Sequence, residues 1–62
     1  MRFRIQLLDR AASVIREMHA DARSVASAVS LVADKDWPPR AVTMRVLDVD
    51  GREVHWAAKE RP

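Results

Sequence analysis

The stretch 44–56 constrains the fold most, because it places the only glycine of the chain between two runs in which apolar and polar residues alternate. Gly51 ends the segment DVDG at 48–51, and this segment suits a type I turn followed by a residue with positive φ. A turn at this position predicts a β-hairpin with a three-residue loop, in which Val46 lies opposite Val54.

The alternation assigns the side chains of this hairpin, which covers about 41–58, to two faces. The apolar face, which is expected to join the core, consists of Val42, Met44, Val46, Val54, Trp56 and Ala58. The opposite and largely polar face consists of Thr43, Arg45, Leu47, Glu53, His55 and Ala57. One apolar and one polar face are typical of a sheet that is covered on one side only.

Another hairpin is predicted at about 2–20. Its first strand alternates, with Phe3, Ile5 and Leu7 directed toward the core. The segment 8–15 then repeats the pattern of 47–54, but Ala12 stands where the other hairpin has its glycine. Because alanine tolerates positive φ poorly, the turn of this hairpin is expected to be strained or differently built.

Two registers are open for this first hairpin. A three-residue loop would pair Ile5 with Glu17 and would place the glutamate beside the core. A loop one residue longer would pair Ile5 with Met18 and would turn Arg16 inward. A β-bulge could reconcile the two registers.

The segment between the hairpins predicts a helix over about 22–34. Asp21 is expected to be its N-cap, because a carboxylate can accept hydrogen bonds from the N–H groups of the first turn. At helical spacing, Val25, Val29 and Val32 gather on one apolar side, which would pack on the sheet. The Pro-Pro pair that follows cannot continue the helix.

The order strand, strand, helix, strand, strand predicts the α+β class: a two-layer ββαββ fold with a four-stranded, mainly antiparallel sheet and one helix packed on one face. The whole chain, 1–62, is expected to be a single domain, with Trp37 closing the open end of the core. The expected core residues are Phe3, Ile5, Leu7, Val25, Val29, Val32, Val42, Met44, Val46, Val54 and Trp56.

Length and composition narrow the functional classes. A chain of 62 residues buries only about 60% of its unfolded surface, so binding a partner would add stability. The chain has no cysteine and no long apolar run, which favours a cytoplasmic protein without disulfides or a membrane span. Its net charge is +2, from nine arginines and two lysines against nine acidic residues. Arginine forks bind phosphates and carboxylates, although ordinary surface ion pairs are the expected use of most of them.

The chain resembles a group of small uncharacterised bacterial ββαββ domains of unknown function. The resemblance rests on the alanine-rich helix opened by Asp21, on the segment Asp-Trp-Pro at 36–38, and on the run VLDVDGREV at 46–54. It covers nearly the whole chain and implies a fold but no activity. The first hairpin and the start of the helix are also similar to HicB-type antitoxins, and that likeness would imply a toxin as partner.

No residue pattern in the chain indicates an enzyme, and no cofactor is expected. A cysteine nucleophile and a glycine-rich phosphate loop are both missing from the sequence. The two histidines, His19 and His55, make a metal site only if carboxylates complete it, so no metal is expected either. Asp48 and Asp50 resemble the start of a calcium loop, but Arg52 stands where the next ligand should be.

The best functional candidate is the sheet face that the helix leaves uncovered. Its expected residues are Arg2, Arg4, Arg16, Arg45, Leu47 and His55. Arg16 joins this face under only one of the two registers of the first hairpin. The preferred hypothesis is a non-enzymatic interaction module that forms a homo-oligomer or binds a protein partner, through this face or through an edge strand. The alternative is binding of the phosphate backbone of a nucleic acid, without help from the aromatic residues, which are all assigned to the core or its end.

Overall fold

The computed structural model describes residues 1–59, apart from the side chain of Asp34; residues 60–62 of the expected domain lie outside the described part. Its elements, in chain order, are β1 (Arg2–Leu8), β2 (Val14–Asp21), α1 (Val25–Ser30), η1 (Asp34–Asp36), β3 (Thr43–Leu47) and β4 (Glu53–Ala58). The strands form one four-stranded sheet in the order β2-β1-β3-β4, and every neighbouring pair is antiparallel. The predicted α+β class and ββαββ order are therefore confirmed.

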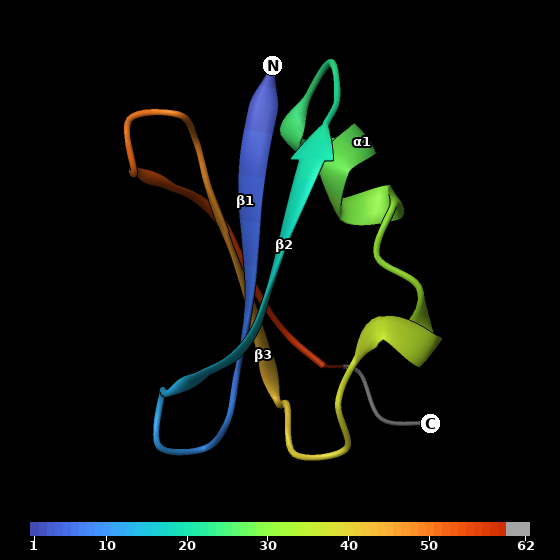
Figure 1. Cartoon of the computed structure of the whole chain (residues 1–62), viewed down its shortest axis with the longest axis vertical. Coiled ribbons are helices and arrows are strands. Elements are labelled where there is room, and N and C mark those ends of the chain that lie inside the picture. Colours follow the sequence, from blue (N-terminus) through green and yellow to red (C-terminus); the bar gives the residue numbers. More distant parts are fainter. Residues whose placement is uncertain (60–62) are drawn as a thin grey trace.

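The two layers are visible in Figure 1, where α1 and the chain that follows it lie on one side of the sheet. The two hairpin turns lie at opposite ends of the sheet, because the central strands β1 and β3 run antiparallel. Within residues 1–59, no helix or strand lies over the other side of the sheet, which we call the outer face.

Both hairpins use the same turn. The N–H of Ala12 donates to the carbonyl oxygen of Asp9 at 3.0 Å, and the N–H of Gly51 donates to the carbonyl oxygen of Asp48 at 3.0 Å. Ala12 and Gly51 both have positive φ, of 63° and 82°. The Oδ1 atom of each aspartate also accepts two backbone N–H groups, which come from Ala11 and Ser13 in the first turn and from Asp50 and Arg52 in the second. The three-residue loop is thus present in both hairpins, and in the first it strains an alanine.

A bulge after the first turn settles the register that was left open. Leu8 pairs with Val14, but Leu7 pairs with Arg16, so Ile15 is an extra residue on β2. Beyond the bulge, Ile5 pairs with Met18. The hairpin therefore has the three-residue loop, and the bulge gives it the strand pairing that was expected of the longer loop. The two registers are reconciled in this way.

The second hairpin contains the same bulge, and this makes the predicted register wrong. Leu47 pairs with Glu53, but Val46 pairs with His55 and not with Val54, which is the extra residue. Side chains beyond the bulge consequently change face. Trp56 lies opposite Arg45 on the outer face, and it is 59% exposed instead of buried in the core.

The short helix explains why the sheet can leave Trp56 outside. A helix of six residues is only about 9 Å long. Its residues Val25, Ala28 and Val29 pack in the core with residues of β1, β2 and β3. In agreement, no residue of β4 belongs to the hydrophobic core cluster.

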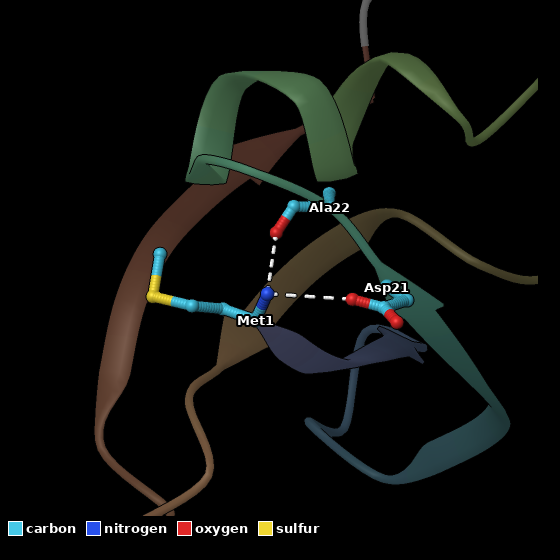
Figure 2. Close-up of polar contacts among 3 residues, drawn as sticks. All are labelled: Met1, Asp21 and Ala22. Atoms are coloured by element: carbon cyan, nitrogen blue, oxygen red, sulfur yellow. Dashed lines mark hydrogen bonds and ion pairs between the residues drawn. The ribbon is translucent and has the colours of Figure 1, made fainter.

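The predicted limits of the helix were too wide, and its predicted N-cap was wrong. The N-cap is Ser24, whose Oγ accepts a hydrogen bond from the N–H of Ser27 at 3.2 Å. Asp21 instead ends β2, and its Oδ1 atom lies 3.3 Å from the amino group of Met1, which also donates to the carbonyl oxygen of Ala22 at 2.9 Å (Figure 2). Valine and serine, which make up much of α1, have modest helix propensity, and this favours a short helix.

The core lies between β1, β3 and the helical side. Its buried residues are Phe3, Ile5, Leu7, Ala20, Ala28, Ala41, Met44 and Val46. Val25, Val29, Val32 and Trp37 are partly buried against them, in agreement with their expected roles. Val42 is only half-buried, and Val54 is exposed. The small residues Ala20, Ala28 and Ala41 were not expected in the core.

The shared turn provides a matched pair of stability tests. Replacing Ala12 with glycine should raise the free energy of unfolding by roughly 1 kcal/mol, because a non-glycine residue is strained at positive φ. Gly51→Ala should lower it by a similar amount, and the reason is again conformational, because a Cβ at Gly51 would meet no atom within 4 Å. Urea denaturation measures both effects. Equal stability of the three proteins would show that the turns are not strained in this way.

Candidate interaction surface

The outer face is formed by the strand side chains that alternate with the buried ones. These are Arg2, Arg4, Gln6 and Leu8 of β1, Val14, Glu17, His19 and Asp21 of β2, Thr43, Arg45 and Leu47 of β3, and Glu53, Trp56 and Ala58 of β4. Paired residues form rows across all four strands. One row contains His19, Arg4, Leu47 and Glu53, and the next contains Glu17, Gln6, Arg45 and Trp56.

Gln6 is the centre of a hydrogen-bonded row on this face. It is 8% exposed, and it is the buried polar residue of the described chain. Its Oε1 atom accepts hydrogen bonds from Nε and Nη2 of Arg45 at 3.1 and 2.6 Å. Its Nε2 atom donates to Oε2 of Glu17 at 3.0 Å. The side-chain amide of Gln6 therefore lies between the guanidinium of Arg45 and the carboxylate of Glu17 and is hydrogen-bonded to both.

This arrangement orients Arg45 without cancelling its charge. A guanidinium has five N–H donors in a rigid fork, and Gln6 binds only one side of that fork. The remaining donors are available to a partner. Because the fork is already held in place, a partner that binds it loses less side-chain entropy than it would with a freely rotating arginine.

Trp56 follows Arg45 in the same row. It shares a shallow cavity of about 300 Å³ with Leu8, Arg10 and Glu53, among others. Leu8 is buried although no helix or strand covers it, because its neighbours on the outer face surround it. A large exposed indole beside a fixed guanidinium is a combination found at the centres of protein interfaces.

The outer face carries charges of both signs. Arg2, Arg4 and Arg45 share it with Glu17, Asp21 and Glu53. The ion pairs of the described residues join the Met1 amino group to Asp21 and His19 to Glu17, at 3.3 and 3.8 Å. The expected use of most arginines in surface ion pairs is therefore not seen in the described part of the chain, since no arginine there pairs with a described carboxylate.

Four of the six predicted surface residues lie on the outer face, and two do not. Arg2, Arg4, Arg45 and Leu47 lie on it as expected. His55 lies opposite the buried Val46 and therefore on the helical side, because of the bulge in β4. Arg16 lies opposite the buried Leu7, because of the bulge in β2, and it is exposed there.

Trp56 was missed as a surface residue. The repeat between 8–15 and 47–54 contained a signal for it, because equal turns predict equal bulges. An unbulged first hairpin would place Glu17 beside the core, and burying an unpaired carboxylate is costly. Applied to both hairpins, this argument shifts β4 by one residue and moves Trp56 outward.

A metal site finds no support among residues 1–59. There, with the side chain of Asp34 left aside, no three histidine, aspartate or glutamate side chains gather as they would around a metal ion. Neither helical segment described has the length and apolar character needed to cross a membrane.

Compared with known proteins, the chain matches no family model, no curated protein and no solved structure. The resemblance to small bacterial ββαββ domains and to HicB-type antitoxins therefore stays a prediction.

The role of Gln6 can be tested through Arg45. In a Gln6→Leu variant the Nε–H of Arg45 should exchange with water at least about tenfold faster, because a hydrogen bond to a charged group is lost. The fold should persist, since Glu17 and Arg45 can both turn to solvent. NMR exchange spectroscopy of the arginine side chains measures the rate. Thr43→Val, in the neighbouring row, is the control, and an unchanged rate in Gln6→Leu would contradict the orienting role.

Proposed function

We propose that this protein is a non-enzymatic interaction module that self-associates through its outer sheet face. The observation that supports the proposal most is the exposure of Trp56 on an uncovered face, beside a guanidinium that Gln6 already orients. Tryptophan and arginine are the residues that most often dominate the energy of protein interfaces. Burying the indole and the half-exposed Leu47 would also extend the apolar area that this small core supplies.

The size of the face fits a weak dimer. Four strands spaced about 4.8 Å apart and up to about 27 Å long present on the order of 500 Å² per copy. Two copies would then bury on the order of 1,000 Å² in total, near the lower limit for a specific interface. Micromolar dissociation constants are therefore expected, with the monomer and the dimer both populated in dilute solution.

Two substitutions on the outer face test self-association. Trp56→Ala and Leu47→Glu should each raise the dissociation constant at least about tenfold, because the first removes the main apolar contact and the second buries an unpaired charge. Sedimentation equilibrium over a range of concentrations measures it. Leu31→Glu is the matched control, since Leu31 is 61% exposed and directly follows α1 on the helical side. A wild-type mass of 7.1 kDa that does not change with concentration would contradict the proposal.

Nucleic-acid binding is the second candidate. It is favoured by the free arginine forks of the outer face together with an exposed indole, because single-stranded nucleic acids bind through phosphate contacts and base stacking. Glu17, Asp21 and Glu53 on the same face oppose it, since they repel phosphates. For this reason it ranks behind self-association.

An NMR titration with short single-stranded oligonucleotides at low salt separates the two functions. Nucleic-acid binding should shift the signals of Arg4, Arg45 and Trp56, and Arg4→Ala should reduce the slope of log K against log salt by about 1. Arg23→Ala, just before α1, should leave that slope unchanged. An absence of shifts at low salt would remove this candidate.

A further inference from the structure

We infer that the two copies pack outer face to outer face about a two-fold axis parallel to the strands, so that Glu17 of each copy lies over the Arg45–Trp56 end of the same row in the other. This inference rests on the proposed self-association and specifies its geometry. It follows from the order of charges along the rows of the sheet.

Packed sheets keep their strands nearly aligned, and this leaves two kinds of two-fold axis. An axis parallel to the strands keeps each row at its height and reverses its direction. The edge strand β2 of one copy then faces β4 of the other, and β1 faces β3. An axis perpendicular to the strands places each strand over the same strand of the second copy. When this axis passes over the row of Gln6, it exchanges the rows on either side of that row.

The parallel axis brings unlike groups together. In the row of Gln6, Glu17 faces Trp56 and Gln6 faces Arg45, so that the carboxylate lies one strand spacing, about 4.8 Å, to the side of the facing guanidinium. In the neighbouring row, His19 meets Glu53, while Arg4 meets Leu47 and can lay its aliphatic stem on it. The charged side chains of these two rows therefore face an oppositely charged, polar or apolar side chain of the second copy.

A perpendicular axis through the row of Gln6 brings like groups together. Glu17 then faces Glu17 of the second copy and Arg45 faces Arg45. The same axis would stack Trp56 on its copy, which is favourable. However, an aromatic pair stabilises an interface less than two facing pairs of like charges destabilise it. Charge order thus favours the parallel axis over a perpendicular axis through the row of Gln6.

Charge exchange between copies tests this geometry. Glu17→Lys and Arg45→Glu should each raise the homodimer dissociation constant at least about tenfold, because each places like charges across the interface. An equimolar mixture of the two variants should associate within about threefold of the wild-type constant. In the mixed dimer the introduced lysine of one copy lies one strand spacing, about 4.8 Å, to the side of the introduced glutamate of the other, and the unchanged Glu17 and Arg45 keep the same relation at the second, native contact. Sedimentation equilibrium measures all three constants.

Two control variants separate the effect of charge at the interface from other effects of these substitutions. Glu17→Gln retains an acceptor for Gln6 and removes only the charge, so it should weaken the dimer less than Glu17→Lys does. Arg23→Glu has the same charge change as Arg45→Glu but lies outside the outer face, and it should leave association unchanged.

The outcomes separate the geometry from the function. Weakening by both variants together with recovery in the mixture supports the parallel axis. A wild-type dimer whose dissociation constant does not respond to Glu17→Lys or Arg45→Glu overturns this geometry but leaves self-association in place. A monomer at every concentration overturns both.

Discussion

The structure depends on one turn that is used twice. The carboxylate of an aspartate accepts hydrogen bonds from two backbone N–H groups, and the backbone carbonyl oxygen of the same aspartate accepts a third. A residue of positive φ completes the loop. A bulge follows in each hairpin and moves every later side chain to the other face. The turn keeps its geometry even where Ala12 makes it unfavourable, so the aspartate bonds and the strand pairing outweigh the strain of one residue.

The bulges, together with the short helix, decide what the surface can do. The first bulge keeps Glu17 out of the core and brings Met18 to the covered side, beside the buried Ile5. The second moves Trp56 out, and no residue of β4 takes part in the core that α1 covers. A longer helix could have buried the indole and left an outer face of ordinary charged residues. The surface that we propose for self-association is thus a consequence of the limited cover that six helical residues provide.

Local chemistry made the fold class predictable, while longer-range effects decided the site. Alternation located the strands, and Gly51 and the repeat of its segment at 8–15 located the two turns, because those signals depend on neighbouring residues. The sequence pointed to Asp21 as the N-cap, but pairing with β1 keeps Asp21 in β2, and the helix begins after Ser24. The bulge opposite Val46 could be deduced only by comparing the two hairpins, because the second turn alone fits a β4 with or without an extra residue.

The two hairpins are related by a pseudo-two-fold axis that passes between Gln6 and Arg45. These two residues pair with each other, and they occupy equivalent positions in the two hairpins, 39 residues apart in the sequence. Glu17 and Trp56 are equivalent in the same way. The backbone is thus nearly symmetric, but the row that crosses it reads anion, amide, cation, indole. If the two ends of this row carried the same side chain, packing it against the reversed row of a second copy would bring like groups into contact. Because its ends differ, the reversed copy places the anion over the indole and beside the cation, and the row becomes complementary to itself.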